Sequence, residues 1–276
     1  MSGGHSPTVG RPLVPGLLCP DWALPKGVGA LLTTCEGGVS AGDFASFNLG
    51  AHVGDDPAAV ASNRARLRAH LPSEPAWLDQ VHGCTVVDAE SVTGHVRADA
   101  AVSRTPGRVC AVMTADCLPV LLCDDDATVV AAVHAGWRGL AAGIVEATVA
   151  HMAVAPSSLR AWLGPAIGPG AFVGGDDVRC ARADSDEEAA QAFVAGAAPG
   201  KWMADLFMLA RLRLRRLGVE RVDGGGACTY SSPRQFYSYR RDARTGRFRL
   251  WSGSMRTDSG LRHGRHPLRI DLQTAW

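Results

Sequence analysis

The chain has 276 residues, of which 46% are hydrophobic, and its 28 basic and 27 acidic side chains give a formal net charge of +1. This composition excludes an intrinsically disordered chain, and the balanced charge excludes the broad basic surface with which proteins bind nucleic acid. No run of about 18 apolar residues could span a membrane, and the N-terminus lacks the pattern of a secretion signal. We therefore expect a soluble, cytoplasmic protein, either a monomer or a homodimer, with no nucleic-acid or membrane partner.

The first quarter of the chain predicts an arm, a strand and a helix. Residues 1–22 are rich in glycine and proline and are expected to form a flexible N-terminal arm. The segment GVGALLTT, residues 27–34, predicts a strand. Asp55 or Asp56 can cap a following helix, whose apolar spacing continues as far as Pro72.

The middle of the chain is rich in short apolar runs bounded by Gly, Pro or Asp. These runs predict five strands that form the core of a sheet, at AWLDQVH, CTVVDAE, RVCAVMT, LPVLLCD and TVVAAVH. A helix is predicted over residues 140–152, and LRAWLG predicts one more strand.

The last third predicts a helix over residues 201–217, which Gly218 ends, and a strand-like segment at FYSYRR. No internal repeat or low-complexity linker divides the chain, so we expect one domain over residues 23–252. Residues 253–276 are polar and irregular and predict a C-terminal tail.

Two of the nine histidines, His82 in DQVHG and His134 in AVHAGWRG, stand where a predicted strand meets a glycine. Cys117 in TADCLPV lies in a similar break between two apolar strands. Side chains at such junctions point into clefts, and two histidines with one cysteine provide three ligands for a tetrahedral catalytic zinc ion. Spacing leaves a second interpretation open, in which Cys117 and a histidine form the nucleophilic pair of a hydrolase. The eight scattered cysteines are expected to be free thiols.

Arg138 follows His134 in a segment that leads from a strand into a helix. Free N–H groups and the positive end of a helix dipole, together with a guanidinium, suit an anion. The same pattern also fits Arg138 paired with a structural carboxylate and Trp137 buried in the core. Arg240 and Arg241 of SYRR could add anion contacts or simply lie on the surface.

Over about residues 30–247, the residues and the order of the sequence motifs resemble those of the multicopper polyphenol oxidase, or laccase-domain, family. The motifs are EGGVS, SFNLGAHVGDDPAAVASNR, DQVHG, ADAAVS, TADCLPVLL, VHAGWRGL, LGPAIGP, ADL and CTYSSPRQFYSYRRDARTGR. This resemblance implies an α+β (mixed α/β) protein, a single-domain αββα sandwich with mixed sheets flanked by helices. It also implies a zinc or copper ion at His82, Cys117 and His134. A thiolate bound to a metal is not free to act as a nucleophile.

Members of that family are described as purine nucleoside phosphorylases with adenosine deaminase and methylthioadenosine phosphorylase activity. The resemblance thus implies phosphorolysis of adenosine, inosine or methylthioadenosine to the free base and a ribose 1-phosphate. Asp116 and Arg138 are the candidate catalytic residues, and Asn48, Arg138 and Arg240 the candidate residues for substrate and phosphate. Asp116 would move the proton in deamination, although a turn-forming role fits it equally well.

Three alternative functions remain open at this stage. Some relatives are called peptidoglycan editing factors, which implies a hydrolase acting on a cell-wall precursor. Laccase-like oxidation with copper is the second, but the chain lacks the several histidine clusters of a multicopper centre. The third is an inactive metal-binding module. It is suggested by departures from the family pattern, with Cys35 at or beside an expected arginine, no carboxylate near Val173, and a longer polar C-terminal tail.

Overall fold

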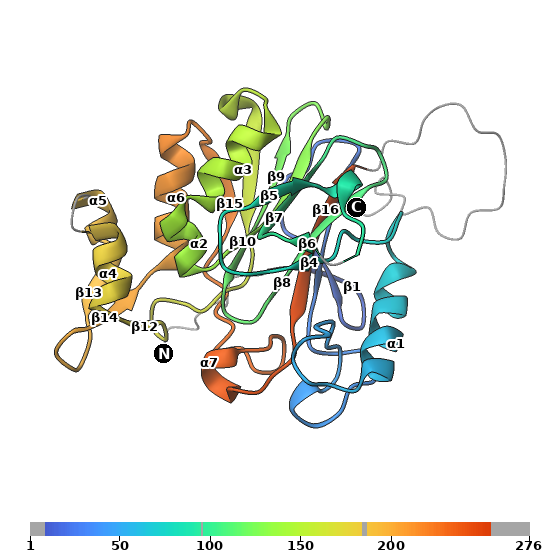
Figure 1. Ribbon diagram of the computed structural model, residues 1–276, viewed down its shortest axis with the longest axis horizontal. Coiled ribbons are helices and arrows are strands. Elements are labelled where there is room, and N and C mark those ends of the chain that lie inside the picture. The colour runs from blue at the N-terminus through green and yellow to red at the C-terminus, as the bar shows by residue number, and fades with distance from the viewer. Residues whose placement is uncertain (1–8, 95, 184–186, 255–276) are drawn as a thin grey trace, which may run out of the picture.

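Two β-sheets form the centre of the computed structural model, which describes residues 9–94, 96–183 and 187–254 (Figure 1). The antiparallel five-stranded sheet has the order β1 (Gly10–Val14), β2 (Leu17–Pro20), β3 (Val28–Thr33), β16 (Phe248–Ser254) and β8 (Val109–Thr114). The six-stranded sheet has the order β15 (Arg221–Gly224), β11 (Leu159–Leu163), β9 (Leu118–Asp124), β10 (Val130–Ala135), β7 (Ala100–Ser103) and β5 (Val86–Asp88). This second sheet is mixed, because β15 and β5 run parallel to their neighbours.

Helices lie on both outer sides of the pair of sheets (Figure 1). One side carries α1 (Pro57–Arg68), and the other carries α2 (Trp137–Ala142), α3 (Ile144–Met152) and α6 (Leu206–Arg216). Three smaller helices are α4 (Asp176–Ala183), α5 (Glu187–Ala190) and α7 (Tyr239–Asp242). A three-stranded sheet has the order β12 (Val173–Gly175), β14 (Lys201–Ala204) and β13 (Phe193–Ala195). A further pair of strands consists of β4 (Leu78–Asp79) and β6 (Val96–Arg97).

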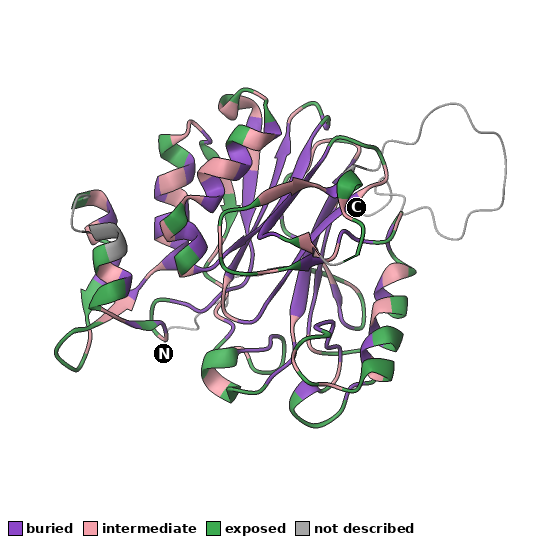
Figure 2. Cartoon of the chain, viewed as in Figure 1, coloured by how far each residue is buried: buried purple, intermediate pink, exposed green. Residues whose placement is uncertain are grey.

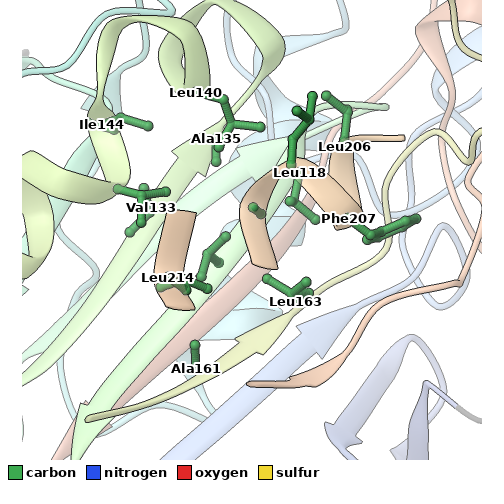
Figure 3. Packing of buried hydrophobic residues seen from close by; sticks show 14 of the residues in the cluster. Leu118, Val133, Ala135, Leu140, Ile144, Ala161, Leu163, Leu206, Phe207 and Leu214 are labelled. Carbon is green, nitrogen blue, oxygen red and sulfur yellow. The ribbon is translucent and has the colours of Figure 1, made fainter. Parts of the chain in front are cut away.

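Three apolar clusters separate these layers, and the strands between them are buried (Figure 2). The first joins the six-stranded sheet to α2, α3 and α6, with Leu118 and Val133 packed against Leu140 and Phe207 (Figure 3). The second lies between the sheets, and the third joins the five-stranded sheet to α1. The order of layers is therefore helix, sheet, sheet, helix, which confirms the predicted αββα arrangement and mixed α/β class.

The side chains of β10 alternate between the two faces of the sheet, and this alternation places His134 towards the space between the sheets. Val133 and Ala135 belong to the cluster that faces the helices, whereas Ala132 belongs to the cluster between the sheets. Because successive side chains of a strand point to opposite faces, His134 shares the face of Ala132. It stands at the end of the strand, where the apolar layer between the sheets gives way to polar groups.

Most of the predicted elements in the core are confirmed. Strands β3, β8, β9 and β11 lie within the predicted segments, and β10 extends one residue beyond its segment, to Ala135. The cap of α1 is Asp56, whose carboxylate accepts a hydrogen bond from the backbone N–H of Ala58. The predicted stop after α6 is also present, since Gly218 has a φ of +88°, which favours glycine. None of the eight cysteines forms a disulfide bond, as expected.

Two predicted helices have wrong boundaries. The segment 140–152 is not one helix, because Gly143 has a φ of +95° and separates α2 from α3. The helix predicted from residue 201 begins only at Leu206, where Asp205 caps it by accepting from the N–H of Met208. The residues before it form β14, which pairs with β12 and β13.

Three further predictions also differ from the structure. The described part of the expected N-terminal arm forms β1 and β2 at the edge of the five-stranded sheet. The second half of the strand-like segment FYSYRR forms most of the short helix α7, capped by Ser238. The tail was expected from residue 253, but β16 continues to Ser254; residues 255–276 lie outside the described part of the chain. In that part, no helix is both long enough and apolar enough to cross a membrane.

Asn63 on α1 connects this helix to the loop that runs along the end of the sheets. Its buried side-chain amide accepts from the N–H of Val39 and donates to Ser40 Oγ and to the carbonyl oxygens of Ser46 and Asn48, all within 3.1 Å. We predict that Asn63→Ala lowers the free energy of unfolding by about 2–4 kcal/mol, because buried polar groups lose their partners. Denaturant unfolding measures this loss.

Ser62→Ala is the matched control on the same helix. Ser62 is exposed and its hydroxyl contacts only the carbonyl oxygen of Ala58 one turn earlier. We expect this variant to change the free energy of unfolding by no more than about 0.5 kcal/mol. An equal effect of both substitutions would contradict the role given to Asn63.

Candidate metal centre and active-site cleft

A cleft of about 480 Å³ opens where strands of both sheets end. Its volume lies within the range of small-molecule sites, about 300–1,000 Å³. It is lined by His52, Gln80, His82, Met113, Thr114, Ala115, Asp116, Cys117, His134, Trp137, Arg138, Ile167, Phe172, Leu206, Tyr239, Arg240 and Arg247. A second hollow, of about 760 Å³ along α6 and β15, has no histidine or cysteine in its walls.

His82, Cys117 and His134 meet in this cleft, with their ligand atoms within 4.8 Å of one another. Cys117 Sγ lies 3.8 Å from His82 Nε2. Cys117 directly precedes β9 and His134 stands near the end of β10, and these two antiparallel strands are neighbours in the sheet. The topology therefore brings together residues that are far apart in the sequence. Among the residues that the structure describes, this is the group able to hold a metal ion.

Asp99, which the sequence interpretation did not single out, holds the side chain of His134 and the backbone of His82. It is fully buried, and its carboxylate lies 2.8 Å from His134 Nδ1. The carboxylate also accepts from the backbone N–H groups of His82 at 2.9 Å and Gly83 at 2.7 Å. With Nδ1 bonded to Asp99, His134 is left with Nε2 to face Cys117 and His82. A carboxylate behind a histidine is the usual support of a metal-binding imidazole.

The charges around Cys117 favour its thiolate form. Burial opposes ionisation of the thiol, but the charge of His134 and hydrogen bonds from His134 and His82 outweigh it and lower the pKa of Cys117 to about 6. Burial also lowers the pKa of His134, but the thiolate of Cys117 and the hydrogen bond to Asp99 more than reverse this. A thiolate and two imidazoles form the mixed S and N donor set that suits zinc.

Gly136 provides the space that this group requires. A Cβ at Gly136 would lie only 2.8 Å from Cys117 Sγ and 3.4 Å from His82 Cδ2, although the φ of this residue, −61°, is open to any amino acid. The glycine is thus needed for room and not for backbone freedom. The donor atoms, their buried support and this space together fit a bound metal ion.

Asp116 lies beside the metal-binding group but has both carboxylate oxygens engaged. Oδ1 accepts from Thr229 Oγ1 and Oδ2 from the backbone N–H of Arg240, each at 2.6 Å. These bonds hold the 228–240 segment against the end of the sheet. The φ of Asp116 is +88°, an uncommon conformation outside glycine, so the backbone before Cys117 is strained.

The two candidate arginines are both exposed but make different contacts. The guanidinium of Arg138 lies 4.6 Å from the ring centre of Trp137. Arg138 is the second residue of α2, a six-residue helix that is shorter than predicted, which weakens the helix-dipole argument for an anion. The guanidinium of Arg240 donates to the carbonyl oxygen of Val173 at 3.1 Å and thus closes one wall of the cleft.

Asn48 lies outside the cleft lining and is fully buried. Its amide contacts Gly50, Asp55 and the backbone N–H of Arg247. It can therefore act on a ligand only through the loop that it holds. Sequence reasoning also missed the lining residues His52, Thr114 and Arg247, although Arg247 ends the TGR motif.

A family model described as "Multi-copper polyphenol oxidoreductase laccase" matches residues 29–252. The chain belongs to this family. A Pseudomonas aeruginosa protein named as a purine nucleoside phosphorylase is 57% identical over 231 residues, covering 84% of this chain and 95% of that protein. The Escherichia coli K12 purine nucleoside phosphorylase YfiH is 53% identical over 237 residues, covering 84% and 96%.

Solved structures of the same fold agree with these relatives. A Neisseria meningitidis protein has a TM-score of 0.83 and 49% identity, and covers 87% of this chain and 99% of its own. YlmD from Geobacillus stearothermophilus has a TM-score of 0.81 and 30% identity, covering 90% and 99%. The structural similarity to these two proteins therefore covers most of the chain.

We predict that Asp99→Asn weakens zinc binding by about 10- to 100-fold, because the neutral amide no longer orients His134 with a full charge. Competition with a chromogenic chelator measures the affinity. Asp88→Asn is the control, since Asp88 also contacts a histidine, with Oδ1 3.0 Å from His151 Nε2, but at the surface away from the cleft. Equal affinities in the two variants would contradict the role of Asp99.

A second prediction concerns the space at Gly136. Gly136→Ala should abolish stoichiometric zinc binding while the protein stays folded, because the added Cβ displaces Cys117 Sγ. Gly170→Ala, where a Cβ meets no atom within 4 Å, should bind zinc like the unchanged protein. Metal analysis after gel filtration, with circular dichroism of both variants, gives the answer; full zinc content in Gly136→Ala would disprove it.

Proposed function

We propose that this protein is a zinc-dependent purine nucleoside phosphorylase that cleaves adenosine, inosine and methylthioadenosine and also deaminates adenosine. The observation that carries the proposal is that one cleft of nucleoside size contains the His82, Cys117 and His134 group together with three guanidinium groups. Relatives with more than half of their residues identical are named as purine nucleoside phosphorylases, which supports the reaction class.

Phosphorolysis makes specific demands on such a cleft. A phosphate oxygen forms a bond to ribose C1′ as the C1′–N9 bond breaks, and the departing base keeps the electron pair and takes up a proton. The ribose gains positive charge on the way, so the enzyme must hold phosphate and sugar in line and exclude water. Arg138 at the cleft and Arg240 in its wall are proposed to draw the anionic and polar substrate parts inward, with Asn48 supporting the loop beside them.

The proposed zinc ion would act as a Lewis acid when bound to His82, Cys117 and His134. The chain supplies the remaining parts of the deamination site. Asp116 is proposed to carry the proton between water and the purine, because it lines the cleft next to Cys117. Both of its oxygens accept one hydrogen bond in the structure, and each keeps a second lone pair for a ligand.

Zinc is favoured over copper by the number and kind of donors. A laccase-type reaction needs several copper ions with additional histidines. The described residues form a single group with two histidines and one cysteine. Cys117 within that group would serve as a ligand and not as a hydrolase nucleophile, because a thiolate bound to a metal cannot attack.

We predict that the purified zinc protein converts adenosine and phosphate to adenine and ribose 1-phosphate, with inosine as the deamination product. Cys117→Ala and His134→Ala should lose zinc and lower kcat by at least about 100-fold. Chromatography of the products and metal analysis on the same samples measure both effects. His151→Ala, at a half-buried histidine outside the cleft lining, is the control.

Two outcomes would contradict the proposal. Full turnover in the zinc-free variants would remove the metal from the reaction. Stoichiometric zinc with no turnover of any purine nucleoside would favour a binding module, and turnover of cell-wall precursors alone would favour an editing hydrolase.

A further inference from the structure

One wall of the cleft carries polar groups that the metal centre does not use. His52 lies in the loop before α1, Thr114 ends β8, and Arg247 directly precedes β16. In the five-stranded sheet, Thr114 pairs with Phe248, the neighbour of Arg247. All three residues line the cleft, and of them Thr114 is buried, Arg247 is half-buried and His52 is exposed. They therefore form one wall, contributed by the five-stranded sheet and its adjoining loop.

Arg247 brings a positive charge into this wall that forms no ion pair with a described carboxylate, although the charges of Cys117 and Asp116 lie near enough to act on it. Among the described residues, its guanidinium makes no ion pair, and Nη1 donates only to the carbonyl oxygens of Thr245 at 3.2 Å and Gly246 at 3.0 Å. Arginine stays protonated in proteins, and a half-buried charge is stabilised by a counter-ion. The planar guanidinium offers forked donors that match the oxygens of a phosphate.

Thr114 adds a hydroxyl group whose hydrogen bonding is incomplete. The residue is 2% exposed, and Oγ1 has no partner in the part of the chain that the structure describes. Buried polar groups in proteins are almost always paired, so an unpaired hydroxyl on a cleft wall indicates a ligand that completes it. Its neighbour Gln80 is already fixed, since its amide makes two hydrogen bonds with the backbone of Met113, each at 2.8 Å.

The loop from Asn48 to His52 is built to hold Arg247 in this place. Asn48 Oδ1 accepts from the N–H groups of Gly50 and Arg247, both at 2.9 Å. A Cβ at Gly50 would lie 2.9 Å from Arg247 Cγ, so only glycine leaves space for the arginine stem. Asn48 is thus a positioning residue, which explains how a fully buried amide outside the cleft can affect the site.

Another part of the cleft lining has a different character. Trp137, Ile167, Phe172 and Leu206 provide apolar surface there. A planar purine suits this part, and an oxyanion suits the wall with Arg247. The metal-binding group is part of the same lining, so both parts of a substrate could reach it.

We infer that Arg247, His52 and Thr114 form a subsite for a phosphoryl group, either inorganic phosphate or the phosphate of ribose 1-phosphate. The inference rests on the proposed phosphorolysis and assigns its anion to the wall of the five-stranded sheet. Arg138, which is exposed, would then attract the anion and not hold it during the reaction.

The test is the Michaelis constant for inorganic phosphate at saturating inosine. Arg247→Gln should raise this constant by about 10- to 100-fold, the range for a lost hydrogen bond to a charged group, and Arg247→Lys by less. The constant for inosine should change by less than about threefold. In the reverse reaction the constant for ribose 1-phosphate should rise in parallel. Arg244→Gln is the control, because Arg244 is exposed and outside the cleft lining.

Thr114 gives a second variant pair that keeps the inference testable if Arg247→Gln does not fold. Thr114→Val removes the hydroxyl at nearly constant shape and should raise the phosphate constant several-fold, whereas Thr114→Ser should restore it. If Thr114 had only a structural role, the Michaelis constant for phosphate would not depend on the presence of the hydroxyl group. An increase with Arg138→Gln and none with Arg247→Gln or Thr114→Val would overturn the inference.

Calorimetric titration of the zinc protein with inorganic phosphate separates this inference from the proposed function. If no ribose 1-phosphate forms but phosphate binds and Arg247→Gln abolishes binding, the proposed function fails and the subsite stands. If Arg247→Gln binds phosphate as tightly as the unchanged protein, or if the unchanged protein binds none, the subsite is disproved.

Discussion

The buried carboxylate of Asp99 connects two segments that would otherwise be independent. It accepts from the backbone N–H groups of residues 81–83 and from the ring of His134, and its own backbone carbonyl accepts from the N–H of His134 at 2.7 Å. Burial disfavours the charged form, but these hydrogen bonds outweigh it and lower the pKa of Asp99. The same interaction therefore stabilises the fold and sets the distance between two candidate metal ligands.

Strand topology supplies the third ligand. Because β9 and β10 are antiparallel neighbours, the start of one lies beside the end of the other, and Cys117 necessarily lies close to His134. Local backbone geometry completes the arrangement. His82 and Asp116 both have positive φ angles, of 60° and 88°, which turn the chain at the points where the ligands leave the sheet. Conformations of this kind cost free energy and persist where the surrounding structure requires them.

The sequence predicted the strands of the core better than the elements at the edge of the cleft. Core strands are marked by continuous apolar runs, whereas α7 and the start of α6 depend on capping by Ser238 and Asp205, which sequence periodicity does not reveal. Residues at strand–glycine junctions indicated the metal-binding group. Asp99 could not be found in this way, because its importance lies in contacts with distant backbone groups. Arg247 was missed for the same reason, since only the fold shows that it lines the cleft and makes no ion pair with a described carboxylate.

The cleft is lined by residues from both sheets, so neither sheet alone could form it. His134 belongs to the six-stranded sheet and Cys117 directly precedes its strand β9, whereas Thr114 belongs to the five-stranded sheet and Arg247 directly precedes its strand β16. Their separation is set by the apolar layer between the sheets, in which Leu121 and Trp162 of one sheet pack in the same cluster as Leu250 of the other. Protein interiors of this kind resist compression, so the layer acts as a rigid spacer. The distance from an anion on one wall to a metal on the other would then be fixed by side chains that contact neither.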